Sequence, residues 1–198
     1  MAGSLAHKSQ EPRVSIEEYW AIEKDSEIKH EWIDGQIYPL SEIKNMAGAT
    51  TQHNRIMMTV GRLLGNQLFR KSCEPFGSDQ RIKVPSTGMR AYPDIQVVCP
   101  PFEYDDELPD TITNPKVIIE ILSPSTQHKD RTKKWFNYQQ LESLTDYLMI
   151  SQEERLIEHY VRHEGGGWHY NMVENDGEIV LASIDCKLNL DDVYERVE

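Results

Sequence analysis

Apolar and polar residues follow two periods along the chain, and together these periods predict an alternation of helices and strands. Between residues 50 and 69, apolar side chains recur every three or four positions, which is typical of an amphipathic helix. Ser15 followed by Glu18 is a capping-box pattern, so a short helix is expected to begin there. A third helical pattern runs from about residue 129 to residue 144.

Short β-prone runs separate these helices. Two of them flank Asp34-Gly35, a dipeptide that is a strong hairpin signal. A second hairpin is expected with Gly165 to Gly167 at its tip. The strand-like segments cover residues 29–40, 73–76, 79–84, 94–99, 116–122, 145–151 and 155–174, followed by a short strand and a last helical turn. Residues 100–115 are rich in proline and acidic side chains, which predicts an exposed loop.

The order of these elements predicts the α/β class, with a mixed α+β sheet that is flanked by helices and carries added β-hairpins. A chain of 198 residues can bury one substantial core and is too short for two ordinary domains. We therefore expect a flexible N-terminal tail over residues 1–14 and a single domain over residues 15–198.

One acidic residue stands out in this pattern, because Glu120 interrupts an aliphatic run over residues 117–122. Acids are rarely buried unless they are paired or bind a metal. Glu120 is therefore either a strand-end residue that reaches solvent or an arginine, or a ligand. Asp94 begins a neighbouring strand, although a Pro-Asp pair is also common in turns. Two carboxylates that converge at a sheet edge suit Mg²⁺ or Mn²⁺, and they predict a metal-dependent phosphodiester hydrolase.

The helix that follows Glu120 offers a cation for such a site. On helical spacing Lys134 lies on the side expected to face the sheet, whereas Lys133 points elsewhere. Lys134 could instead form a surface pair with Asp130, four residues earlier. We favour Lys134 as the residue that orients the attacking water and stabilises developing charge.

Charge and cysteine content limit the partners of the protein. A net charge of −12 repels nucleic acid and anionic membranes at long range, so any nucleic-acid function needs a local basic patch or metal ions. Three widely spaced cysteines without a CxxC pair indicate neither a disulfide framework nor a zinc knuckle, which favours the cytoplasm. The sequence contains neither a secretion signal nor a long apolar stretch, so no membrane association is expected.

Several segments in a fixed order resemble the Uma-two family of restriction-endonuclease-like proteins, which is common in cyanobacteria. The segments are "HEWIDGQIY", "QHNRIMMTVGRLL", "YPDIQVV", "VIIEILSPST", "DRTKKWFNY" and "DYLMIS", and the resemblance covers nearly the whole chain. That family belongs to the PD-(D/E)XK nuclease superfamily. The resemblance therefore implies a restriction-endonuclease-like core and, as is frequent in that superfamily, a homodimer.

The resemblance also assigns roles to individual residues. Asp94 becomes the acid of the PD element, Glu120 the acid of the (D/E)XK element, and Glu31 a family acid that completes the site. The lysine expected two residues after Glu120 is Leu122 here, and Lys134 matches the position on the next helix to which this lysine has moved.

His53 also matches a family position. A histidine at the start of a helix more often packs against the core, and we expect this for His53.

Two functions follow from these residues. The first is a metal-dependent endonuclease in which Asp94, Glu120, the Ile121 carbonyl and Glu31 hold Mg²⁺ or Mn²⁺. Its nucleic acid, expected to be DNA, would contact the cations Lys129, Arg131, Lys133, Arg81 and Lys83, with Arg90 as an extension of the same surface. The second is a binding or regulatory module that keeps the nuclease fold without hydrolysis, with the acidic loop around Asp105 as a protein contact.

Overall fold

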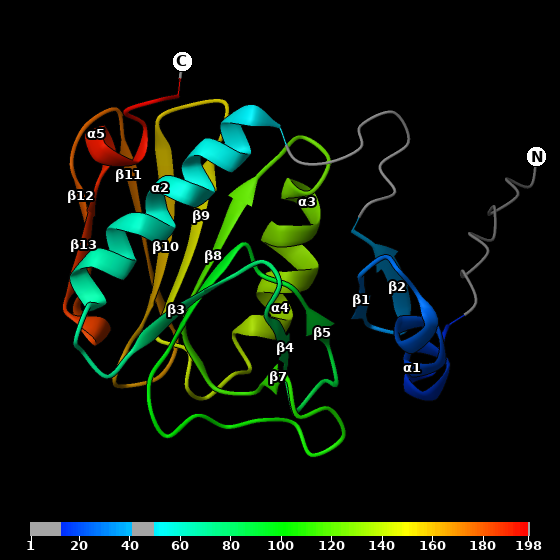
Figure 1. Cartoon of the computed structure of the whole chain (residues 1–198). Coiled ribbons are helices and arrows are strands. Elements are labelled where there is room, and N and C mark those ends of the chain that lie inside the picture. The colour runs from blue at the N-terminus through cyan, green and yellow to red at the C-terminus, as the bar shows by residue number, and fades with distance from the viewer. Residues whose placement is uncertain (1–12, 41–49, 198) are drawn as a thin grey trace, which may run out of the picture.

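A six-stranded mixed sheet forms the centre of the molecule (Figure 1). The computed structural model describes residues 13–40 and 50–197, so most of the predicted N-terminal tail lies outside the described residues. The sheet has the order β11-β10-β9-β8-β6-β3, and β8 and β9 are parallel while the other neighbours are antiparallel. Its strands are β3 (Glu74–Gly77), β6 (Ile95–Val98), β8 (Pro115–Leu122), β9 (Asp146–Ser151), β10 (Leu156–Arg162) and β11 (Trp168–Glu174).

Helices cover both faces of this sheet, and alternation along β8 decides what each face receives. Val117, Ile119 and Ile121 pack in the core under the long helix α2 (Thr51–Leu68). Ile118 and Leu122 belong to the opposite core. A chain of short helical turns covers that second face, namely α3 (Gln127–Lys129), the π-helical segment η1 (Asp130–Lys134) and α4 (Trp135–Tyr138). Glu120 therefore projects toward the face that carries Lys134.

A second sheet lies beside the first and has the order β2-β1-β5-β4-β7. Asp34 and Gly35 both have positive φ values, of 53° and 81°, as a tight hairpin turn requires. The capping box of Ser15 and Glu18 begins helix α1 (Ile16–Asp25) as predicted. The strands are β1 (His30–Ile33), β2 (Gln36–Pro39), β4 (Arg81–Lys83), β5 (Arg90–Ala91) and β7 (Thr111–Ile112).

The C-terminal segment packs against α2, which completes the first core. It forms the hairpin β12 (Glu178–Leu181) and β13 (Cys186–Asn189), joined by the 3-10 turn η2 (Ala182–Ile184), and then the single turn α5 (Leu190–Val193). The predicted short strand and last helical turn are thus present, and β12 adds a strand that the pattern did not predict.

Two predicted boundaries are wrong. The helix expected over residues 129–144 begins at Gln127 and ends at Tyr138, because Leu141 and Leu144 are buried in an irregular connection that packs on the second core. Apolar spacing alone cannot separate such a connection from a helix.

The loop over residues 100–115 is also less exposed than predicted. Asp105 is only 6% exposed, because its carboxylate pairs with Lys83 and Arg90, and the loop contains β7. Arg90 is itself almost fully buried by these contacts, so it extends no open basic surface.

The expectation that the cysteines form no disulfide is wrong as well. Cys73 and Cys99 are joined by a disulfide, although 26 residues separate them in sequence. Each adjoins the end of one strand of the antiparallel β3–β6 pair, which places the two side chains opposite each other. Because spacing in the sequence does not report strand pairing, the cysteine count no longer supports a reducing compartment. Among the described residues, no helix is long and apolar enough to cross a membrane.

Candidate active site

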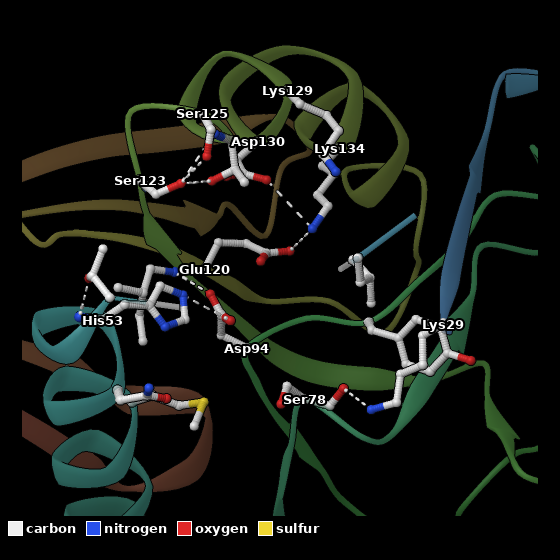
Figure 2. A pocket seen from close by; sticks show the side chains of 17 residues that line it. Lys29, His53, Ser78, Asp94, Glu120, Ser123, Ser125, Lys129, Asp130 and Lys134 are labelled. Carbon is white, nitrogen blue, oxygen red and sulfur yellow. Dashed lines mark hydrogen bonds and ion pairs between the residues drawn. The ribbon is translucent and has the colours of Figure 1, made fainter. Parts of the chain in front are cut away.

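A cleft of about 320 Å³ opens at the carboxyl end of β8, between the start of α2 and the helical turns α3 and η1. Figure 2 shows Asp94, Glu120 and Lys134 facing one another in this cleft, with His53 beside Asp94. The structure therefore brings together the three residues that the sequence predicted as catalytic. Lys134 does not point to solvent, since its side chain is only 5% exposed.

Asp94 lies directly before β6 and is held by two neighbours. Its Oδ2 accepts a hydrogen bond of 2.7 Å from the main-chain N–H of Ile121, and its Oδ1 lies 3.2 Å from Nε2 of His53. The side chain keeps 18% of its surface exposed in the cleft. Asp94 is thus tied to β8 across the sheet, and the alternative of a simple Pro-Asp turn does not describe it.

Glu120 is a deeply buried acid that lines the cleft. Its Oε1 accepts hydrogen bonds from Lys134 Nζ at 3.0 Å and from the Tyr138 hydroxyl at 2.8 Å, and the side chain is 4% exposed. Burial raises the pKa of Glu120 to about 8, and the nearby carboxylates of Asp130 and Asp94 add to the rise against the effect of Lys134. Glu120 is therefore a carboxyl group that readily holds a proton near neutral pH.

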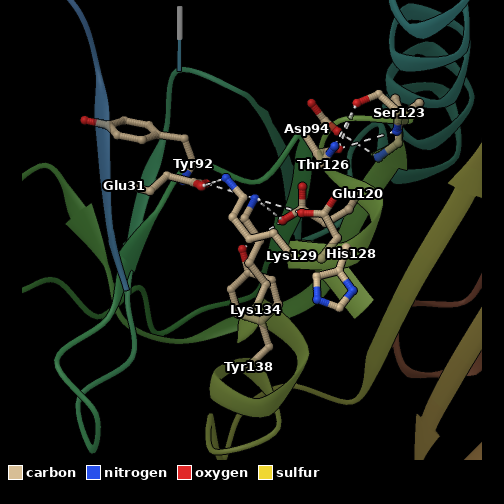
Figure 3. Close-up of polar contacts among 12 residues, drawn as sticks. Glu31, Tyr92, Asp94, Glu120, Ser123, Thr126, His128, Lys129, Lys134 and Tyr138 are labelled. Carbon is tan, nitrogen blue, oxygen red and sulfur yellow. Dashed lines mark hydrogen bonds and ion pairs between the residues drawn. The ribbon is translucent and has the colours of Figure 1, made fainter. Parts of the chain in front are cut away.

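Lys134 contacts three carboxylates at once, and Figure 3 shows two of them, those of Glu31 and Glu120. Its Nζ lies 2.9 Å from Glu31 Oε1, 3.0 Å from Glu120 Oε1 and 3.5 Å from Asp130 Oδ1. The predicted pair with Asp130 therefore exists, but it is buried and adds to the contacts within the cleft. Burial acts to lower the pKa of Lys134, but Glu120 and Glu31 outweigh it and hold the pKa well above its ordinary value.

Glu31 comes from β1 in the second sheet and is fully buried. Besides Lys134, it accepts a 2.6 Å hydrogen bond from Lys129 Nζ and a 3.3 Å hydrogen bond from the main-chain N–H of Tyr92. Burial alone would raise the pKa of Glu31, but Lys134 and Lys129 hold it below its usual range. The structure thus places Glu31 behind Lys134, where it anchors the lysines, and its role as a metal ligand stays a prediction.

The donor atoms of the cleft fit a hard cation in their chemistry. Asp94 and Glu120 supply carboxylate oxygens, which Mg²⁺ and Mn²⁺ prefer. The cluster around Lys134 contains three acids and two lysines, so a cation could replace the proton that Glu120 otherwise holds. Within the described residues, no group of three or more His, Cys, Asp or Glu side chains is arranged to hold a metal ion. Two carboxylates, backbone oxygen and water are therefore the donors that the cleft offers.

The cations predicted to contact nucleic acid all have internal partners. Lys129 pairs with Glu31, Arg131 with Glu158, and Lys133 with Gln36 and the Tyr38 hydroxyl. Arg81 and Lys83, on β4, pair with Glu23 and Asp105 respectively. Lys129 lines the cleft, but the five do not form one free basic surface. Their role in binding stays a prediction.

Sequence reasoning missed two residues of the site. His53 was expected to pack in the core, yet it lines the cleft and its Nε2 contacts Asp94. Its match to a family position was the signal that could have identified it. Tyr138, which donates to Glu120, was not identified from the sequence, because no feature of its segment distinguishes it from a core residue.

Comparison with known proteins identifies the family and the fold of the chain. A family model described as "Uma2: Putative restriction endonuclease" matches residues 16–190. "Uncharacterized protein slr1290" from Synechocystis sp. is 33% identical over 183 residues, which are 92% of each chain. "Uncharacterized protein sll1609" from the same strain is 33% identical over 143 residues, or 72% of this chain and 77% of that one.

A solved structure from Anabaena variabilis ATCC 29413 shares the fold. It is described as "a putative nuclease belonging to DUF820", and it superposes with a TM-score of 0.75 at 16% identity over 93% of this chain and 99% of that chain. The predicted restriction-endonuclease-like fold, a mixed sheet flanked by helices, is confirmed.

Proposed function

Because this chain belongs to the Uma2 family of restriction-endonuclease-like proteins, we propose that it is a metal-dependent endonuclease that hydrolyses phosphodiester bonds of nucleic acid. One observation carries the proposal. Asp94 and Glu120, from two adjacent strands, line the same cleft, and the buried cation Lys134 lies 3.0 Å from Glu120. Such a set of acids and one lysine is suited to charge stabilisation during phosphodiester hydrolysis.

The proposed cofactor is Mg²⁺ or Mn²⁺, held by Asp94, Glu120 and the main-chain carbonyl of Ile121. When bound, such an ion polarises a phosphoryl oxygen and acidifies a water molecule. The chain prepares for it in two ways. The Ile121 N–H and His53 orient the Asp94 carboxylate, and Tyr138 and Lys134 orient that of Glu120. These hydrogen bonds and contacts therefore hold each carboxylate in a defined position in the cleft.

Lys134 is the proposed water-orienting residue. Its ammonium group remains protonated, because the carboxylates around it hold its pKa high. It therefore acts as a hydrogen-bond donor and a positive charge rather than as a base. Burial of 95% of its side chain strengthens both effects, since the local dielectric constant is low.

DNA is the proposed substrate, and the protein is proposed to act as a homodimer in the cytoplasm. An edge strand supports association of two copies. β11 ends the six-stranded sheet, and it exposes Tyr170 and Met172 by 45% and 50%. Light scattering coupled to size-exclusion chromatography tests the dimer, and cell fractionation tests the location.

The activity is tested by nicking of supercoiled plasmid by purified protein with Mg²⁺ or Mn²⁺. Glu120→Gln is prepared identically, and Lys24→Gln, on the exposed face of α1, serves as a folded control. We expect cleavage by the parent and by Lys24→Gln, loss of cleavage in Glu120→Gln, and no cleavage in EDTA.

If the parent and Glu120→Gln behave alike on DNA and RNA, both duplex and single-stranded, the nuclease proposal is wrong. The alternative is then a binding or regulatory module that keeps the fold. The observation that favours this alternative is that Glu31 already forms ion pairs with two lysines, Lys129 and Lys134.

A further inference from the structure

A second hollow, of about 340 Å³, lies beside the first half of α2. It is lined by Thr51, Asn54, Arg55, Met58, Thr59 and Arg196. Its polar groups are two guanidinium groups, two hydroxyls and one amide, all of which can donate hydrogen bonds. Among the residues that the structure describes, no acidic side chain lines it. The hollow is therefore built for an anion.

The two arginines keep their positive charge available. Arg55 donates to the main-chain oxygen of Arg196 at 2.9 Å, a contact that fixes the guanidinium without neutralising it. Arg196 lies 4.0 Å from Glu195, and these two side chains are 77% and 62% exposed, so the pair is weak. Among the described residues, no ion pair involves Arg55.

Helix α2 as a whole extends this positive region. It contains Arg55 and Arg62 but no aspartate or glutamate over its 18 residues. The two arginines are seven residues apart, so they lie on the same face of the helix, about 10 Å from each other. On a chain with a net charge of −12, a helix with two arginines and no acidic residue does not itself repel a polyanion.

Asn54 connects this surface to the candidate active site, because its side chain lines both the hollow and the cleft that contains Asp94 and Glu120. A nucleic-acid strand with a phosphate in the cleft would place a neighbouring part of its backbone along α2. The cations predicted from the sequence are less suited to this task, because each is already paired inside the protein.

We propose that the hollow beside α2 binds a backbone phosphate of the nucleic-acid strand that enters the cleft. This inference rests on the proposed function and adds to it the path that the substrate strand follows along α2. Arg55 and Arg196 contact the phosphate through their guanidinium groups, and the hydroxyls of Thr51 and Thr59 donate to its oxygens. Met58, which is 67% exposed, offers an apolar contact to the adjoining sugar or base.

The test measures binding without cleavage, so that it is independent of the nuclease assay. Fluorescence anisotropy with short labelled single-stranded and duplex DNA is recorded in EDTA over a range of KCl concentrations. Arg55→Gln and Arg196→Gln are compared with Lys24→Gln, which removes one exposed positive charge on α1. Arg55→Lys keeps the charge and removes the guanidinium fork. Circular dichroism establishes that each variant is folded.

We expect Arg55→Gln and Arg196→Gln to weaken DNA binding by about five- to tenfold, and to reduce the slope of log K against log salt by about one. Arg55→Lys should fall between Arg55→Gln and the parent, and Lys24→Gln should match the parent.

Unchanged binding by Arg55→Gln and Arg196→Gln would overturn the inference while plasmid nicking by the parent still upheld the nuclease. If the variants lose binding of inorganic phosphate but bind the strand as the parent does, the hollow is a site for a free anion, and the inference is wrong. If the parent binds neither DNA nor RNA, no nucleic-acid strand occupies the hollow, and the inference is wrong. If the variants lose DNA binding but the parent does not nick DNA, the proposed strand path along α2 stands and the nuclease proposal is wrong.

Discussion

Two buried acids on neighbouring strands of the central sheet differ in how their charge is balanced. Asp146, on β9, is 2% exposed, and its carboxylate lies 2.8 Å from His159 Nε2 and accepts hydrogen bonds from Ser183 and Thr145. Burial acts to raise the pKa of Asp146, but these hydrogen bonds hold it below its usual value. Glu120, on β8, shares one lysine with Glu31 and Asp130, and burial raises its pKa to about 8.

The difference distinguishes a structural acid from the acid that we propose to be functional. Asp146 is matched by its own donors and does not line the cleft, so it is a stable part of the core. Glu120 shares the single ammonium group of Lys134 with Glu31 and Asp130, which is costly unless a proton or a cation is also bound. A perturbed pKa in a cleft is typical of functional sites, whereas a buried acid with a full set of donors is not.

Removal of the shared cation should have the largest effect. Lys134→Met leaves Glu31 and Glu120 buried without their partner, so we expect a loss of about 3–5 kcal/mol of unfolding free energy at pH 8. At pH 5 the loss should be smaller, because Glu120, whose pKa is raised to about 8, then carries a proton.

Urea unfolding at both pH values measures this, with Lys133→Met as the control. Lys133 contacts the uncharged groups of Gln36 and Tyr38 and should matter less. Equal losses for the two lysine variants would contradict the view that Lys134 balances the buried acids.

Asp94→Asn should leave the fold intact and remove activity. Its amide oxygen can still accept from the Ile121 N–H, and the side chain is partly exposed, so we expect a small change in stability. Loss of the carboxylate should slow plasmid nicking at least about 100-fold, or about 3 kcal/mol of transition-state stabilisation. Nicking at the parent rate by folded Asp94→Asn would remove Asp94 from the site.

Asp146→Asn should show the opposite behaviour. The amide cannot satisfy His159, Ser183 and Thr145 together, so we expect a loss of about 1–3 kcal/mol of unfolding free energy. Nicking per folded molecule should equal that of the parent, because Asp146 does not line the cleft. Thermal unfolding and the nicking assay are run on the same preparation, and a loss of specific activity at temperatures where the variant is folded would make Asp146 functional.

Glu120→Gln should change stability in a pH-dependent manner. Because the folded-state pKa of Glu120 is raised, ionisation of Glu120 destabilises the fold increasingly as pH rises from about 4.5 to about 8. The variant carries no such charge. Its stability relative to the parent should therefore rise by about 1 kcal/mol or more between pH 5 and pH 8.5, as measured by urea unfolding. A difference that does not vary with pH would show that Glu120 is not held protonated.

Much of the central fold follows from local pattern. The capping box of Ser15, the Asp34-Gly35 turn and the aliphatic run of β8 each predicted the element that the structure contains, because each signal is local to its segment. The predicted helix end near residue 144 failed, because Leu141 and Leu144 serve the core from an irregular connection. The prediction of no disulfide was wrong for the same kind of reason, since strand pairing brings Cys73 and Cys99 together.

The sequence by itself determined the candidate acids and the lysine. An acid in an aliphatic strand, an acid at a strand start and a lysine on the sheet-facing side of a helix are local patterns, and they identified Glu120, Asp94 and Lys134. The tertiary structure alone decided how these charges are balanced. Glu31 and His53 come from elements far away in the chain, and their contacts with Lys134 and Asp94 exist only after the second sheet and α2 have packed. The pairing of the predicted basic residues was equally invisible, because a charge is neutralised by what lies near it in space rather than in sequence.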